Sequence, residues 1–200
     1  MVLLRSNAEH IYWLGRYLFR IDHVAQQLPL TNDQQAAAFA QALYLQIEDA
    51  ESLNQFMLDR KQPYSLLSQL EVARDNIQEL RGLLSSQAYA ELNHLIKNAP
   101  SDALMISDIV KQCCAILDAE QEEVCLFLHI GQNVECIDTY FRFQHDINNV
   151  LDTIEPVIER LFHIGWSDLQ PSWEILKDQP YLNQFYAFTY KLENQFEVSS

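Results

Sequence analysis

The stretch RSNAEHIYWLGRYLFRIDHVAQ, residues 5–26, decides the fold class, because its apolar residues recur with the period of an α-helix. At about 100° per residue, one face of this helix would carry Leu3, Ile11, Leu14, Leu18, Ile21 and Ala25. The opposite face is polar and holds Arg16 and Arg20, one turn apart with no acid between them. Since like charges at this spacing repel, we expect acidic groups from another helix or from a ligand to compensate them.

The composition of the remaining chain favours helices and excludes several partners. The 200 residues are 48% hydrophobic and include only 4 glycines and 6 prolines, which favours long uninterrupted helices over many-turned β structure. The net charge of −15 argues against nucleic acid and against an anionic membrane surface. No apolar run approaches the roughly 20 residues that span a bilayer, and no apolar signal segment follows Arg5. We therefore expect a cytoplasmic protein.

Periodicity and capping signals predict an all-α protein, a single helical bundle of about six to eight helices. The first helix would end before Pro29, and Thr31 with Gln34 forms a capping box for the second. Pro63 marks the first turn of the third helix, and Ser101 or Asp102 caps a later one. Residues 165–180 are expected to form a loop packed onto the bundle. The expected helices are 3–28, 31–59, 63–84, 85–97, 103–143 with a possible break near 119–120, 147–162 and 181–196.

Two glycine-containing segments suggest an internal repeat. WLGRYLFRID at 13–22 aligns with HIGQNVECID at 129–138 at an offset of 116 residues, which pairs Gly15 with Gly131. A glycine inside a helix costs about 1 kcal/mol relative to alanine. Two of them in matched settings therefore suggest a close helix–helix approach at both sites. Coincidence between two amphipathic helices is the alternative, and the sequence leaves it open.

Charged residues on several helices form a ladder that a bundle would bring together. Glu9 lies one turn from Arg5 and Tyr12, while Glu135 and Asp138 share a face that could neutralise arginines of other helices. One interpretation is a polar pocket in which guanidinium groups hold a carboxylate or phosphate. The other is an interhelical salt-bridge network or a set of solvated faces. The candidate binding residues are Arg5, Glu9, Arg16, Arg20, Asp22, Arg74, Asp75, Asn76, Arg81, Glu135 and Asp138.

Residues typical of metal sites and catalytic centres do not form a recognisable set. Glu159 and His163 are one turn apart, but the remaining ligands of a dinuclear carboxylate site are missing. Cys114, Cys125 and Cys136 recur every 11 residues, which places their sulfurs too far apart for zinc and favours structural cysteines. We find no phosphate-binding loop or nucleophile motif. We expect no metal, no cofactor and no catalytic activity of the chain on its own.

The C-terminal helix is unusually aromatic. Phe185, Tyr186, Phe188, Tyr190 and Phe196 occupy one short segment. Aromatic residues are enriched both in cores and at interfaces. The helix therefore either closes the hydrophobic core or docks a partner or a second copy of the chain.

Three blocks of the sequence resemble the bacterial alpha-E domain family. They are YWLGRYLFR at 12–20, preceded by Arg5 and Ala-Glu at 8–9, MLDRKQPYSLLSQLEVARDNIQ at 57–78, and FLHIGQNVECID at 127–138. The resemblance covers most of residues 1–145. It implies that 1–200 form a single alpha-E-like helical domain, with 146–200 as a helical C-terminal extension.

The chain departs from the family pattern at four charged positions. Phe19 stands where the family has Glu, Gly82 where an Asp usually follows Arg81, and Gln132 and Cys136 where it has arginines. About half of the family's charged ladder is therefore kept, and the sequence leaves open whether the site is active or decayed.

The resemblance also implies partners. Alpha-E domains accompany circularly permuted ATP-grasp proteins, transglutaminase-like proteins and proteasome-like peptidases, in systems linked to peptide or amide formation. We therefore expect an accessory binding domain whose ladder orients a partner or an anionic amino-acid-like group. The alternatives are a structural homo-oligomer held by the aromatic C-terminal helix, or an enzyme with Glu9, Asp22 or Glu135 as acid–base groups.

Overall fold

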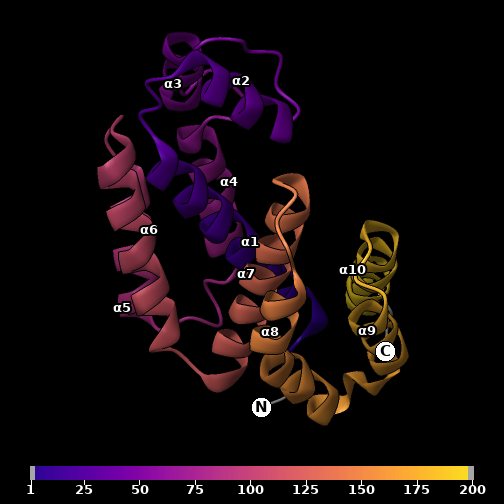
Figure 1. The fold of residues 1–200 in the computed structure, drawn as a ribbon. Helices are drawn as coiled ribbons and strands as arrows, with labels where there is room; N and C mark the ends of the chain where they lie inside the picture. The colour runs from indigo at the N-terminus through magenta and orange to yellow at the C-terminus, as the bar shows by residue number, and fades with distance from the viewer. Residues whose placement is uncertain (1–2, 198–200) are drawn as a thin grey trace. The chain divides into compact units, whose positions relative to one another are not determined.

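The computed structural model describes residues 3–197, and all regular secondary structure in this part of the chain is helical (Figure 1). The all-α prediction is confirmed. The predicted number of six to eight helices is wrong, because these residues form ten α-helices. They are α1 (Arg5–Gln27), α2 (Asp33–Ala42), α3 (Ala50–Leu58), α4 (Leu66–Glu79), α5 (Ser86–Lys97), α6 (Ala103–Asp118), α7 (Glu122–Arg142), α8 (Asn148–Leu161), α9 (Gln170–Asp178) and α10 (Leu182–Glu197).

The predicted helix over 31–59 is two helices. Asn32, not Thr31, caps α2, because its side chain accepts the N–H of Gln35. The end of α2 is a Schellman motif, in which the N–H of Leu45 bonds to the carbonyl of Ala40 at 2.8 Å and Tyr44 has a φ of +59°. A glycine usually occupies this position, so a tyrosine there does not indicate the end of a helix in the sequence.

The other boundaries are closer to those expected. The break near residues 119–120 separates α6 from α7, and Asp102 caps α6. Ser65, rather than Pro63, marks the start of α4, since its side chain accepts the N–H of Ser68. The predicted loop at 165–180 is wrong: the backbone kinks at Gly165, whose φ is +105°, and a 3₁₀ turn η2 (Ser167–Leu169) then leads into α9.

A second Schellman motif ends α7, and Gln144 occupies its left-handed position. Its φ is +56°, and the next residue, His145, donates its N–H to the carbonyl of Tyr140 at 2.8 Å. Because a Cβ is disfavoured at positive φ, Gln144→Gly should raise the free energy of unfolding by about 0.5–1 kcal/mol, measured by urea unfolding. Gln144→Ala keeps the Cβ and should give no gain. An equal gain for both variants would contradict the motif.

The helices form two compact units rather than one bundle. The first unit comprises the described residues up to Arg16 together with those from Gln121 onward, and the second unit comprises Tyr17–Glu120. Helix α1 therefore contributes to both. In the second unit, α4 packs against α5 and α5 against α6. Among residues 3–197, no helix combines the length and the hydrophobicity that crossing a membrane requires.

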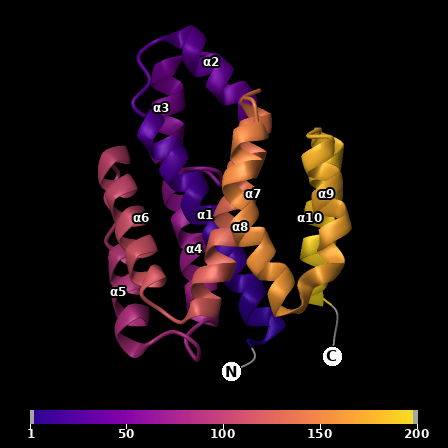
Figure 2. The same ribbon diagram turned by 60° about the horizontal axis from the view of Figure 1, so that its bottom comes forward.

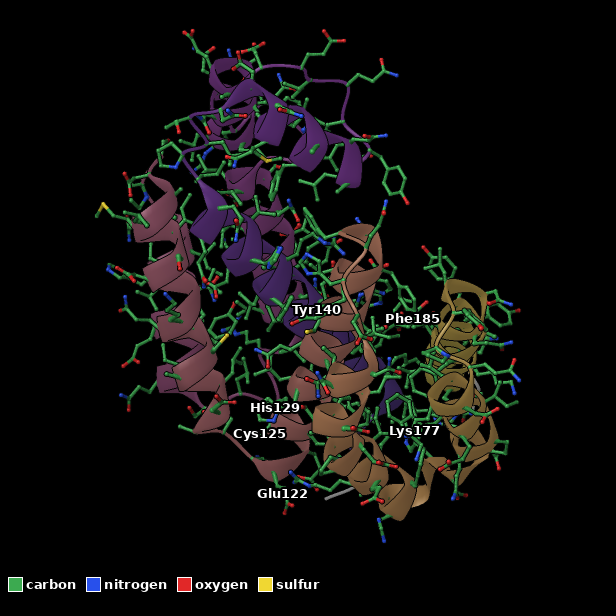
Figure 3. All side chains as sticks on the ribbon, in the orientation of Figure 1. Glu122, Cys125, His129, Tyr140, Lys177 and Phe185 are labelled. Atoms are coloured by element: carbon green, nitrogen blue, oxygen red, sulfur yellow. The ribbon has the colours of Figure 1, made fainter. Side chains whose placement is uncertain are left out.

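The core of the first unit is built by α7 together with the C-terminal helices. Helices α9 and α10 lie side by side in Figures 1 and 2. Phe185 lies on the side of α10 toward α7, where its ring centroid is 5.6 Å from that of Phe141 (Figure 3). Phe196, near the end of α10, contacts the rings of Tyr12 and Trp166. Lys177 of α9, labelled in the same figure, pairs with Glu155 of α8. The contacts of Phe185 and Phe196 confirm that the aromatic C-terminal helix closes a core.

Candidate functional site

The site begins at a crossing of two helices within the first unit, α1 and α7, where two glycines allow the backbones to touch. A Cβ placed on Gly15 would lie 2.3 Å from the carbonyl oxygen of Leu128, and one on Gly131 would lie 2.0 Å from that of Tyr12. Each glycine thus faces the carbonyl three residues before the other. This confirms the predicted close approach. The two contacted carbonyls, of Tyr12 and Leu128, are also 116 residues apart, like the two glycines, and this supports the internal repeat.

Arg16 follows Gly15 and is the centre of a buried charge cluster. Its side chain is 12% exposed, and its Nε donates to Oε2 of Glu135 at 2.9 Å. Its Nη1 donates to Oε1 of Glu193 at 3.1 Å, and its Nη2 lies 3.9 Å from Oδ2 of Asp138. The guanidinium carbon is 4.9 Å from the centroid of the Trp13 ring, a cation–π distance. Of the predicted acids, Glu135 and Asp138 therefore do compensate Arg16.

Tyr12 places a second donor beside Arg16. Its hydroxyl is buried, donates to Oε1 of Glu193 at 2.8 Å and lies 3.3 Å from Nη1 of Arg16. Burial raises the pKa of Tyr12 above its ordinary value, so the phenol stays protonated and remains a donor. The acceptor of Tyr12 is thus Glu193 of α10, and not Glu9, which the helical spacing had suggested.

Arg142 closes the cluster at the end of α7. Its Nη2 donates to Oδ2 of Asp138 at 2.5 Å. Burial is the largest single effect on the pKa of Arg142 and lowers it, but the charge and hydrogen bond of Asp138 together with the charge of Glu135 raise the pKa above its usual range. Burial likewise lowers the pKa of Arg16, and the nearby oxygens of Tyr12, Glu135 and Glu193 together raise it more. We call the following residues the Arg16 cluster: Tyr12, Arg16, Glu135, Asp138, Arg142 and Glu193.

The cluster carries more acid than base. Its two guanidinium groups face three carboxylates, so its formal charge is −1. The second carboxylate oxygen of Asp138, Oδ1, is buried and has no hydrogen-bond partner among residues 3–197. An additional anion would therefore meet net repulsion unless it replaced one of the carboxylates already present.

The other predicted site residues do not belong to this cluster. Arg5 donates to the backbone carbonyl of Gln195 at 2.8 Å, and Glu9 is half-buried on α1. In the second unit, Asp22 accepts hydrogen bonds from Ser107 and Gln26, each at 2.6 Å.

The remaining candidates of the second unit have partners near them in sequence. Arg74 pairs with Glu71 at 3.0 Å, and Asn76 donates to the carbonyl of Val72. Arg20 lies over the ring of Tyr17 and Arg81 over that of Tyr89, and Asp75 is exposed. Of the predicted ladder, Arg16, Glu135 and Asp138 thus meet in one cluster of the first unit, and Arg74 and Asn76 have partners within their own helix.

Sequence reasoning missed three members of the Arg16 cluster, Tyr12, Arg142 and Glu193, and also Trp13, whose ring lies against Arg16. Arg142 could have been found, because it lies four residues after Asp138 on the same helix. Trp13 had no signal beyond its position beside Tyr12. Glu193 had none, since it is 177 residues from Arg16 and lies in a helix whose aromatic residues dominate its pattern.

Two of the cysteines, Cys113 and Cys136, are protonated at neutral pH. Burial raises the pKa of Cys113 to about 12 and that of Cys136 to about 11. Within residues 3–197, no group of three or more His, Cys, Asp or Glu side chains is placed to hold a metal ion. Of the three regularly spaced cysteines, Cys114, Cys125 and Cys136, each is half-buried, whereas Cys113 is buried.

The fold and the site together define a helical domain built around an internal arginine–carboxylate network. The family model Alpha-E, described as a predicted alpha-helical domain with a conserved ER motif, matches residues 3–155. The chain belongs to the Alpha-E family. No curated protein and no solved structure matches the sequence. The matched region ends within α8, so Glu193 of α10 lies beyond it.

Proposed function

We propose that this chain is an accessory helical binding domain of an ATP-grasp-linked system that forms peptide or amide bonds or modifies proteins. In this proposal, the Arg16 cluster contributes a charged interhelical site for a partner or for an anionic amino-acid-like group. Membership of the Alpha-E family supports the helical domain. The partner would bind ATP and catalyse the bond formation.

The observation that carries the proposal is the convergence of two donors on one carboxylate oxygen. Nη1 of Arg16 and the hydroxyl of Tyr12 both reach Oε1 of Glu193, at 3.1 and 2.8 Å. A planar guanidinium paired with a neutral hydroxyl recognises carboxylates with defined geometry. Arg16 is also held by Glu135 through its Nε, so its guanidinium group is already oriented toward Glu193.

The alternative of an acid–base enzyme has less support. Glu135 is buried and bound to Arg16, so a substrate proton has no direct access to it. Asp22 belongs to the second unit and is already bonded to Ser107 and Gln26. Glu9 is half-buried on α1 and is not a member of the Arg16 cluster. Binding therefore accounts for these residues better than catalysis.

A homo-oligomer is the second candidate, and one observation favours it. Leu182, Tyr186 and Tyr190 recur every four residues on α10 and are each at least 43% exposed. A tyrosine-rich exposed stripe is typical of interfaces. Sedimentation velocity of the purified chain at micromolar concentration separates the two candidates, because a monomer contradicts the oligomer.

Association with an ATP-grasp protein tests the first candidate. We expect the purified chain to form a complex with a circularly permuted ATP-grasp protein or a transglutaminase-like protein, with a micromolar dissociation constant by calorimetry. The complex should raise the partner's amide-forming rate with ATP and amino acids. The matched control is Tyr190→Ser, which removes the most exposed ring of the stripe, 68% exposed, and changes no residue of the Arg16 cluster. Absence of a complex with either partner class at tens of micromolar would contradict the proposal.

A further inference from the structure

Glu193 is the most accessible acid of the Arg16 cluster. Its side chain is 35% exposed, whereas those of Glu135 and Asp138 are 2% and 3% exposed. It also comes from α10, beyond the residues that the family model matches. Of the three carboxylates, Glu193 is therefore the one that can exchange with solvent.

The donors that hold Glu193 would stay in place without it. Tyr12 is completely buried, and its ring contacts those of Trp13 and Phe196. Arg16 is held by Glu135 through Nε and lies over the Trp13 ring. Removing Glu193 would leave the Tyr12 hydroxyl without its acceptor and would leave Nη1 of Arg16 with only the Tyr12 oxygen, at 3.3 Å. A buried donor without an acceptor favours a replacement.

Exchange does not require α10 to leave the core. Its other face is anchored by four side chains that are at most 6% exposed: Phe185, Phe188, Leu192 and Phe196. The aromatic contacts of Phe196 with Trp166 and Phe127 fix the same end of the helix that carries Glu193. Rotation of the Glu193 side chain alone is therefore sufficient to open the site.

We propose that Glu193 is an internal occupant of a carboxylate-binding fork formed by Arg16 and Tyr12, and that a carboxylate from outside the chain replaces it. The choice of an amino acid or a peptide carboxyl group as ligand rests on the proposed function. Charge favours carboxylate over phosphate: without Glu193 the cluster is neutral, so a monoanion restores the present charge of −1, whereas a dianion exceeds it. The fork therefore selects a carboxylate.

Chemical rescue of a Glu193→Ala variant tests this inference. We expect the variant to melt at a lower temperature than the wild type and to regain stability in sodium acetate. At acetate concentrations about tenfold above the dissociation constant, the melting temperature should rise by about 3–6 °C. Sodium chloride and sodium phosphate at matched ionic strength should give no comparable rise. Sodium glutamate and a short peptide with a free C-terminus then distinguish a free amino acid from a peptide end.

Three variants serve as controls. Wild-type protein should respond much less than Glu193→Ala, because the external carboxylate must first displace Glu193 from the fork. Glu197→Ala removes an exposed acid one turn further along α10 and should not respond. Tyr12→Phe in the Glu193→Ala background keeps the buried ring, removes one donor and should reduce the response at least severalfold. The inference is overturned if acetate stabilises Glu193→Ala no more than chloride does, or stabilises Glu197→Ala equally.

A folding defect would not end the test. If Glu193→Ala does not fold, Glu193→Gln keeps the length of the side chain and an acceptor for Tyr12, and it should show a smaller rise that still exceeds that of Glu197→Ala. No rise for this variant also overturns the inference. Since the measurement needs no partner protein, its failure leaves the association experiment above untouched, and the reverse also holds.

Discussion

Gly131→Ala is expected to lower the free energy of unfolding by about 3 kcal/mol or more, at the upper end of overpacking effects. The added Cβ would lie 2.0 Å from the carbonyl oxygen and 2.9 Å from the carbonyl carbon of Tyr12. Both are backbone atoms, so no change of rotamer relieves the clash, and α1 and α7 must move apart. Arg16 is next to this crossing, and its bond to Glu135 would be strained by the same movement.

Thermal unfolding followed by circular dichroism checks this result. For a chain of this length, the loss corresponds to a decrease in melting temperature of about 6–12 °C. Gly15→Ala should behave similarly, because its Cβ would lie 2.3 Å from the carbonyl oxygen of Leu128. Gly82→Ala is the matched control, since a Cβ there has no neighbour within 4 Å. A change at Gly131 no larger than that at Gly82 would show that the helices do not cross at the glycines.

The close helix–helix contact at Gly15 and Gly131 was predictable from the sequence, because a glycine within a helical pattern needs a reason. Glycine in the middle of a helix is unfavourable unless something approaches the backbone closely. The helical period of its apolar residues predicted α1 equally well. Ile11, Leu14 and Leu18 are fully buried, as predicted. Local patterns that arise within one helix were therefore read correctly.

Features that depend on other parts of the chain were not predictable. Tyr44 ends α2 in a backbone conformation that usually signals glycine, so the break in 31–59 was hidden. Glu193 reaches the site only because aromatic residues of α10 pack against α1 and α7, and a helical pattern does not reveal which helices pack together. The helical spacing suggested Glu9 as the partner of Tyr12, whereas the Tyr12 ring is buried and its hydroxyl donates to Glu193.

An internal repeat would give two of the departures from the family pattern a common explanation. The offset of 116 residues relates Arg16 to Gln132 and Glu135 to Phe19. The chain thus keeps both members of one arginine–glutamate pair and has neither charge at the two corresponding positions. Because a buried charge that loses its partner costs several kcal/mol, loss of both charges is less costly than loss of one. The kept pair is the one that the Arg16 cluster uses.

Arg16→Met is expected to lower the free energy of unfolding by about 3–5 kcal/mol, the range for breaking a buried ion pair by removing one partner. The methionine fills part of the volume but leaves Glu135 and Asp138 buried with one guanidinium fewer. Equilibrium urea unfolding measures the loss. The matched control is Arg60→Met, which breaks the exposed pair of Arg60 with Glu71, whose side chains are 52% and 37% exposed. That change should cost at most about 1 kcal/mol.

A double-mutant cycle separates the ion pair from simple loss of packing. Arg16→Met/Glu135→Met removes one charge of each sign, so the double variant should be less destabilised than the sum of the two single variants by about 1–3 kcal/mol. If the two single effects add, Arg16 and Glu135 do not interact in solution, and the fork that holds Glu193 loses its support. If they couple as expected, Glu135 is the residue that orients Arg16 toward Glu193. A ligand that replaces Glu193 then meets a guanidinium already in place.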